Sequence, residues 1–184
     1  MKTRLLFLCT FLMLCCIQLN AQKVYTKNGS VSFFSTSSME NISASNNQLM
    51  SVLNVPSGEL QFSLLIKGFH FKKSLMETHF NENYLESDKY PKATFKGKIN
   101  NITIVNFTKD GTYNVEVSGD LMMHGATNKV TTAGTITVKA GVITATANFK
   151  VKLSNYKISI PKIVKDNIAE TVDVKISCLY DQKM

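Results

Sequence analysis

Long runs of alternating apolar and polar residues constrain the fold of this chain more than any other feature. In residues 142–154 the two kinds of side chain change places at almost every position, and residues 170–180 repeat the pattern. Successive side chains of a β-strand point to opposite faces, so a period of two predicts strands with one buried and one solvated face. The apolar face of the first segment holds Ile143, Ala145, Ala147, Phe149, Val151 and Leu153.

The same pattern predicts strands over most of the chain. They cover residues 31–36, 41–45, 49–55, 59–67, 93–105, 112–123, 129–139, 142–154 and 170–180. Asn46-Asn47 and Pro56-Ser57-Gly58 are typical of turns between early strands, while Asp110-Gly111 and Ala140-Gly141 predict tight hairpin connections. Sequential hairpins make an antiparallel meander.

Eight or nine such strands without crossover helices must close on themselves or stack as two sheets. Closure is favoured because several strands run over roughly 11 to 13 residues, about 36 to 44 Å, and long strands build tall barrels. The predicted fold class is therefore all-β, an antiparallel β-barrel of about eight strands. Small residues on the apolar faces either leave a cavity for one small ligand or allow bends and close packing. These are Gly97, Gly119, Ala145 and Ala147.

One segment, residues 76–95, departs from the alternation and predicts a short helix inserted between the early and the late strands. Its residues Met76, Phe80, Tyr84 and Leu85 follow the helical period and form one apolar stripe. Tyr90-Pro91 then ends the helix, because proline disfavours the α region for the residue before it. A single amphipathic helix in a β chain needs a sheet to lie on, so we expect a lid or plug over one end of the barrel.

The N-terminus, residues 1–21, has the pattern of a signal peptide, with Lys2 and Arg4 before an apolar run and Ala21 at the cut. We expect export, most simply to the periplasm, and one mature domain over residues 22–184. A lipoprotein anchored through Cys15 or Cys16 is the less favoured reading, because a lipobox has a small residue before the cysteine. Removing 21 residues from 184 leaves 163, the size of one ordinary domain.

Processing also removes three of the four cysteines, so only Cys178 remains and stability must come from a packed core. The net charge falls from +8 to +6 with the loss of two basic residues, and the remaining lysines are scattered. A scattered cationic surface tolerates transient contact with a membrane surface and argues against nucleic-acid binding.

Three stretches of the chain carry a family resemblance. They are residues 79–95, with His79-Phe80, Tyr84-Leu85 and Tyr90-Pro91; residues 119–130, with Gly119, Leu121, Gly125 and Thr127; and residues 149–161, with Phe149 and Tyr156 to Pro161. In this order and at this spacing, the chain resembles the YceI-like family of exported polyisoprenoid- and lipid-binding proteins. The resemblance covers nearly all the mature sequence. It implies a lipocalin-like antiparallel barrel with an elongated apolar lumen that takes a long-chain lipid, typically an isoprenoid.

Catalytic and metal-binding patterns are absent from the sequence. His70, His79 and His124 show no ligand spacing, and no nucleophile elbow or phosphate loop occurs. Cys178 lies on the apolar face of a strand, where cysteine usually acts as a small hydrophobe. His124 precedes Gly125 and is expected to be an exposed turn residue. We therefore expect no enzyme, no metal and no cofactor.

The sequence favours an exported, non-enzymatic protein that holds a long apolar ligand, an isoprenoid or a fatty-acyl lipid, for storage or transport in the cell envelope. The alternative is a structural or interaction barrel with a filled core and no ligand. The candidate lining residues are Phe62, Leu64, Val115, Val117, Leu121, Ala145, Ala147, Phe149 and Val151, and the candidate lid residues are Met76, His79, Phe80 and Tyr84.

Overall fold

Eight strands of 7 to 14 residues form the wall of the molecule in the computed structural model, which describes residues 23–164 and 166–183. The predicted signal peptide, residues 1–21, lies outside the described residues. The wall strands are β1 (Lys23–Thr36), β2 (Asn41–Asn54), β3 (Glu59–Leu65), β5 (Lys92–Ile99), β6 (Gly111–Met123), β7 (Ala126–Lys139), β8 (Val142–Lys152) and β9 (Thr171–Tyr180). Two further strands, β4 (His70–Phe71) and β10 (Gln182–Lys183), have two residues each.

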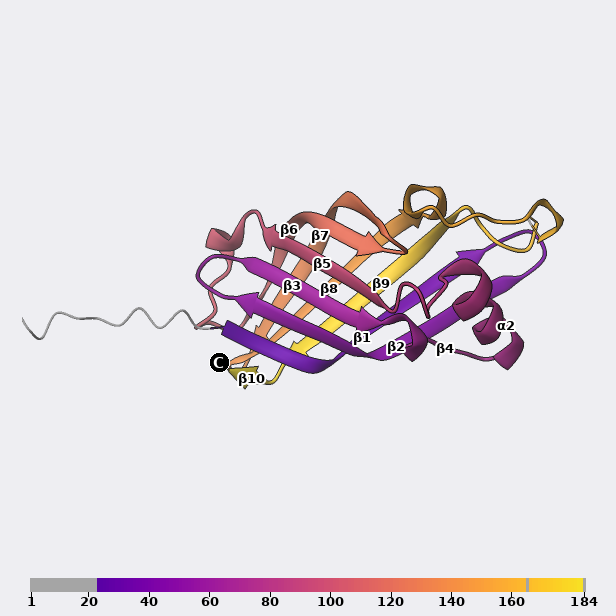
Figure 1. Ribbon diagram of the computed structural model, residues 1–184. Coiled ribbons are helices and arrows are strands. Elements are labelled where there is room, and N and C mark those ends of the chain that lie inside the picture. The colour runs from indigo at the N-terminus through magenta and orange to yellow at the C-terminus, as the bar shows by residue number, and fades with distance from the viewer. Residues whose placement is uncertain (1–22, 165, 184) are drawn as a thin grey trace, which may run out of the picture.

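The strands close into an antiparallel barrel, as the sequence predicts. Neighbours along the chain pair with one another, and β1 pairs with both β2 and β9. At the closing seam Val31 faces Asn46 on one side and Ile176 on the other. Every pairing is antiparallel, so the wall is an up-and-down meander joined at its first and last long strands (Figure 1).

The two ends of the barrel carry different structures (Figure 1). One end, called the lid end below, holds the β1–β2 hairpin, the β6–β7 turn, the segment between β8 and β9, and the helix α2 (Ser74–His79) with the π-helical turn η3 (Phe80–Tyr84). The other end, called the floor end, holds the β2–β3, β5–β6 and β7–β8 connections. Short 3-10 turns complete the chain: η2 (Ile66–Gly68), η4 (Ile102–Ile104), η5 (Leu153–Tyr156) and η6 (Lys162–Val164).

Strand β2 continues through Asn46-Asn47, where the sequence predicts a turn, and this prediction is wrong. The β1–β2 register shifts between Gly29 and Val31, which marks a β-bulge. Asn46 is fully buried, with its Nδ2 donating to the Leu65 carbonyl at 2.9 Å and its Oδ1 accepting from the Gln48 N–H at 2.8 Å. The amide side chain therefore satisfies a backbone donor beside the irregular pairing and a carbonyl at the end of β3.

The two predicted hairpin turns differ in outcome. Ala140 and Gly141 both have positive φ, 49° and 77°, and join β7 to β8 as a two-residue turn, as predicted. Asp110-Gly111 is not a tight turn: β5 ends at Ile99, and a longer connection with η4 leads to β6. The side chain of Asp110 instead accepts from the Ala140 N–H at 2.9 Å and ties this connection to the neighbouring turn.

The predicted helix is shorter than expected, since α2 ends at His79 and the chain continues as η3 to Tyr84. It ends before Tyr90-Pro91, because Ser87 already returns its N–H to the Asn81 carbonyl at 2.8 Å. The predicted stripe of Met76, Phe80, Tyr84 and Leu85 nevertheless faces the barrel interior. The segment lies across the lid end, as the sequence predicts (Figure 1).

The hydrophobic core is densest toward the floor end. The most deeply buried side chains there are at most 2% exposed, and they are Val24, Leu53, Ile136 and Val138. Residues nearer the lid end, such as Phe33, Phe149 and Val174, are only partly buried although they point inward. The inward side chains are therefore packed more tightly at the floor end than around these three residues.

Candidate functional site

An apolar cavity of about 350 Å³ occupies the barrel between this floor and the lid. Ligand pockets in proteins typically have volumes of about 300 to 1,000 Å³, so the space fits one small or slender molecule. Leu53, Leu60 and Ile136 form its bottom, and Met76, Phe80 and Tyr84 form its top. The lining is almost wholly hydrocarbon, and Glu40 and His79 at the lid end are among its few polar side chains.

All nine candidate lining residues lie around this one cavity. They come from β3, β6 and β8, and they are Phe62, Leu64, Val115, Val117, Leu121, Ala145, Ala147, Phe149 and Val151. The four lid candidates, Met76, His79, Phe80 and Tyr84, also border it, although His79 is largely exposed. Their contact with a ligand is part of the proposal below.

The small residues on the inner face play two different roles. A Cβ on Gly97 would lie 2.3 Å from the Ser118 carbonyl, and a Cβ on Gly119 would lie 2.5 Å from the Gly97 Cα. These two glycines face each other across β5 and β6 and let the strands and the Phe95 ring pack closely. Ala145 and Ala147 border the cavity and leave space that larger side chains would fill.

The sequence does not predict several of the residues that line the cavity. Strand β7 contributes Val130, Thr132 and Gly134, and its alternation is weak because threonine and glycine stand on the inner face. The segment between β8 and β9 contributes Ile158 and Val164 without any regular pattern. Phe33 could have been predicted, because it is in phase with Val31 on the alternating face of the predicted strand 31–36, whereas Phe69 and Phe71 lie outside the predicted strands.

Four phenylalanine rings attach the lid to the wall. Phe80 of η3 lies 5.6 Å from the Phe33 ring, 5.5 Å from Phe69 and 5.0 Å from Phe71, measured between centroids. Ring pairs at 4.5 to 7 Å are favourable beyond their buried area. The lid therefore rests on an aromatic cluster at the edge of the cavity.

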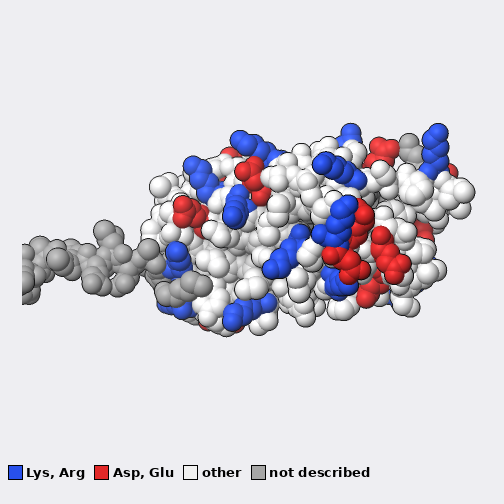
Figure 2. Space-filling model, viewed as in Figure 1, with Lys and Arg blue, Asp and Glu red and all other residues white. Residues whose placement is uncertain are grey.

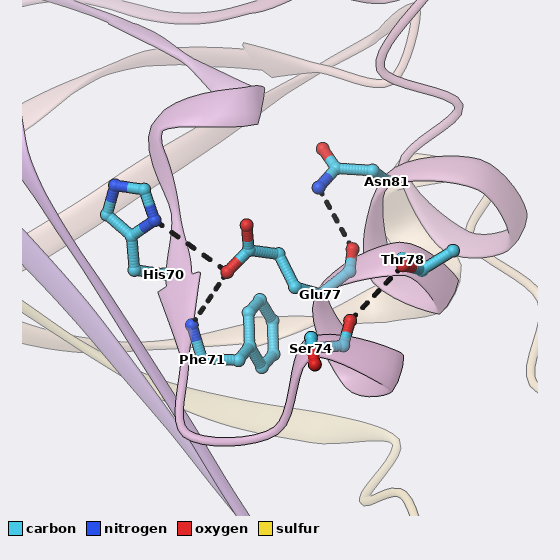
Figure 3. Close-up of polar contacts among 6 residues, drawn as sticks. All are labelled: His70, Phe71, Ser74, Glu77, Thr78 and Asn81. Carbon is cyan, nitrogen blue, oxygen red and sulfur yellow. Dashed lines mark hydrogen bonds and ion pairs between the residues drawn. The ribbon is translucent and has the colours of Figure 1, made fainter.

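Glu77 fastens the same lid to β4 (Figure 3). Its carboxylate accepts from the Phe71 N–H at 3.1 Å and lies 3.7 Å from His70 Nδ1. Asn81 donates to the Glu77 carbonyl at 2.9 Å and holds the start of η3 against α2. The Glu77 carboxylate therefore satisfies a backbone N–H of the short strand.

His124 lies in the β6–β7 turn, as predicted, but it is buried there, so the predicted exposure is wrong. Its Nε2 lies 2.8 Å from Glu86 Oε2, and its Nδ1 lies 2.9 Å from the Tyr156 carbonyl oxygen. Both ring nitrogens therefore lie within hydrogen-bond distance of an oxygen atom from another segment. Tyr90 packs edge-on against the ring at 4.7 Å. One side chain thus joins the β6–β7 turn, the exit of the lid and η5.

We predict that His124→Asn destabilises the protein by about 2 kcal/mol. Asparagine tolerates the positive φ of 49° at this position, so the loss reports the ring contacts and not the turn. Urea unfolding of His124→Asn, Glu86→Gln and the double variant measures the effect and the coupling between the two residues. A loss below about 0.5 kcal/mol for His124→Asn would contradict this role.

The cavity wall is split between β7 and β8 toward the lid end. Their pairing runs from Gly134 and Ala147 to Lys139 and Val142, with no further pair of these two strands among residues 23–164 and 166–183. Beyond it, Thr132 Oγ1 donates to the Asn148 carbonyl at 3.0 Å, and Asn128 Nδ2 donates to the Asn155 carbonyl at 2.7 Å. Side-chain hydrogen bonds and η5 therefore close this part of the wall in place of a ladder.

A small cluster of polar side chains is buried near the floor end. Ser51 Oγ and Tyr180 Oη share a hydrogen bond of 2.7 Å, and burial raises the pKa of the Tyr180 hydroxyl. Cys178 lies beside them, 1% exposed, and burial raises the pKa of its thiol from 9.0 to about 12. A thiol held protonated in an apolar site is inert, in agreement with its predicted role as a small hydrophobe.

We expect the Cys178 thiol to react about a thousandfold more slowly in the native protein than in urea at pH 8, because a pKa raised by three units lowers the thiolate fraction by that factor. The rate of a disulfide-exchange reagent on the chain beginning at residue 22, where Cys178 is the single cysteine, measures this. Rates within tenfold of each other would show that the thiol is accessible.

The described residues also lack two features that would suggest other kinds of site. No group of three or more His, Cys, Asp or Glu side chains in this part of the chain is arranged to hold a metal ion. None of its helices has the length and apolar character that crossing a bilayer requires. The charged side chains on the face seen in Figure 2 are of both signs and interspersed.

Comparison with known proteins gives a consistent result. Solved structures that share the fold include the following three. A polyisoprenoid-binding domain from Saccharophagus degradans, implicated in plant cell wall breakdown, is 16% identical, with a TM-score of 0.74 over 87% of this chain and 97% of its own. BcnA from Burkholderia cenocepacia is 18% identical, with a TM-score of 0.65 over 81% and 94%. The YCEI protein of Campylobacter jejuni is 17% identical, with a TM-score of 0.57 over 78% and 88%.

None of the curated proteins matches this sequence. Residues 21–179, however, match the model of the YceI-like domain, which covers most of the chain and includes every strand of the barrel wall except the last residue of β9. The chain belongs to the YceI-like domain family.

Proposed function

We propose that this protein is an exported, non-enzymatic binding protein that holds one long-chain apolar ligand, an isoprenoid or another lipid, in its barrel. The observation that carries the proposal is the apolar cavity of about 350 Å³ inside a closed wall. A polyisoprenoid-binding domain with the same fold supports the class of ligand. The signal-peptide pattern of residues 1–21 supports export, to the periplasm in preference to a lipoprotein anchor.

Binding would be driven by burial alone. Each Å² of apolar ligand surface removed from water contributes about 25 cal/mol, offset by the ordering of a flexible chain. The lining offers few polar partners, so an apolar tail would lie deepest, against Leu53 and Leu60, and a polar end would lie near Glu40 and His79. The nine lining and four lid candidates would carry these contacts, in a protein that stores or transports its ligand in the envelope.

Native mass spectrometry of the protein purified from its own envelope, followed by organic extraction, tests the proposal. We expect one lipid per chain, released by organic solvent. A protein that is always free of lipid and takes up no isoprenoid or fatty-acyl probe would overturn it. That result would favour the alternative of an interaction barrel, for which the filled floor half is the structural basis.

A further inference from the structure

Three exposed apolar side chains stand together at the lid end. Met39 is 74% exposed, Leu75 is 66% exposed and Ile163 is 95% exposed, the highest values among large apolar residues in the described part of the chain. They come from three separate segments, the β1–β2 hairpin, α2 and η6. Figure 1 shows these segments gathered at one end of the barrel. The three residues are called the apolar tips below.

Each apolar tip is the neighbour in sequence of a residue that borders the cavity. Glu40 follows Met39, Met76 follows Leu75 and Val164 follows Ile163, and all three followers line the cavity. In each segment one side chain turns toward the lumen and the adjacent one projects away from the protein. The apolar tips therefore surround the lid end of the cavity and are not scattered over the barrel.

Direct contacts fix the three segments to one another. The Met39 N–H donates to the Asp166 carbonyl at 3.3 Å, which links the hairpin to the segment that carries Ile163. Lys73 Nζ lies 2.7 Å from Glu40 Oε1, which links the hairpin to the start of α2. The apolar tips are thus held as a group.

We propose that the apolar tips dock the lid end on the surface of a lipid bilayer, inserting Met39, Leu75 and Ile163 among the head groups. The inference rests on the proposed function, because a water-insoluble ligand must pass between the cavity and a membrane. Three side chains on separate projections are too little for a protein partner, since a stable protein interface buries about 800 Å² on each side. A bilayer surface adapts to separate projections and accepts single apolar side chains at its interface.

Charge plays a small part in this docking. Among the described residues, the lid end with the two lysines just before α2 carries charges of both signs, and neither sign dominates. They are Lys72, Lys73, Lys157 and Lys162, and Glu40, Glu77, Glu82, Asp166 and Glu170. We therefore expect binding to zwitterionic vesicles and little sensitivity to salt, in contrast to basic patches that require anionic lipid.

Co-sedimentation with phosphatidylcholine vesicles tests the proposal, using the processed protein purified from the envelope. The triple variant Met39→Ser, Leu75→Ser, Ile163→Ser is expected to lose at least tenfold in vesicle partitioning. The matched control is Met50→Ser, Met122→Ser, Leu179→Ser, which removes three apolar side chains, 52%, 43% and 51% exposed, from the outer wall. The control should stay within twofold of the natural protein, and circular dichroism checks that both variants fold.

Three results would overturn the docking. The natural protein would not bind, both triple variants would lose binding equally, or binding would need anionic lipid and be abolished by salt. Association of the protein with itself through the apolar tips, seen by light scattering, would do so as well. Lipid content by native mass spectrometry separates this outcome from failure of the proposed function, since the apolar tips lie outside the cavity. If the triple variant of the apolar tips keeps its lipid but loses vesicle binding, the result supports both the docking and the proposed function.

Discussion

Substitution of Ala147 by phenylalanine is expected to remove the bound lipid while leaving the barrel folded. Ala147 lies on the inner face of β8, opposite Gly134 of β7, and both border the cavity. A phenyl ring at this position would occupy the space of about 350 Å³ that the ligand needs. We expect at least a tenfold loss of lipid in native mass spectra and a change in unfolding free energy below about 1 kcal/mol, because the ring enters empty space.

Ala133→Phe is the matched control. Ala133 precedes Gly134 on β7 and is exposed on the outer face, so the same ring would project into solvent. Its lipid content should equal that of the natural protein. If Ala147→Phe instead costs about 1 to 3 kcal/mol and leaves bound lipid unchanged, this part of the barrel is packed and the cavity is not the binding site.

Substitution of Gly119 by alanine is expected to cause a large loss of stability for a single added methyl group. The new Cβ would lie 2.5 Å from the Gly97 Cα and 2.5 Å from the Lys96 carbonyl oxygen, both of them backbone atoms. Because backbone cannot rotate out of the way, β5 and β6 must separate where they pair. We expect a loss of about 3 kcal/mol in urea unfolding, the upper part of the range for overpacking.

Gly134→Ala supplies the comparison. A Cβ at Gly134 has the Thr146 carbonyl at 3.1 Å, but its next neighbours are side-chain atoms at 3.5 and 3.7 Å, beside the cavity. The expected loss is within about 1 kcal/mol. Equal losses at the two glycines would mean that the contact between β5 and β6 is no closer than elsewhere in the wall.

Alternation alone predicts much of this molecule. A period of two assigns the inner faces of β3, β6 and β8 correctly, because a strand that packs on a core buries its apolar residues on one face only. The helical period likewise predicts that Met76, Phe80 and Tyr84 face inward. The fold and the general position of the cavity could therefore be predicted, and the resemblance to the family supported closure.

The features that the sequence could not predict depend on contacts between residues that are distant along the chain. The sequence suggests that the His124 side chain is exposed in its turn, because its contacts with Glu86 and Tyr156 form only in the folded chain. The sequence suggests a turn at Asn46, because the hydrogen bond from its side chain to the Leu65 carbonyl forms only after β2 and β3 pair. Gly119 and Ala147 look equivalent as small inward residues, and only their neighbours across the wall distinguish close contact from open space.

Closure of the wall between β1 and β9 has a consequence for how the protein assembles. Strand β1 forms a hairpin with its neighbour β2 and also pairs with β9, which lies near the opposite end of the chain. Pairings between such distant segments form slowly, so the hairpins are expected to come first and the β1–β9 seam last. Until then two unpaired edges are open to other chains. Aggregation during folding should therefore depend most on how soon the C-terminal strand becomes available.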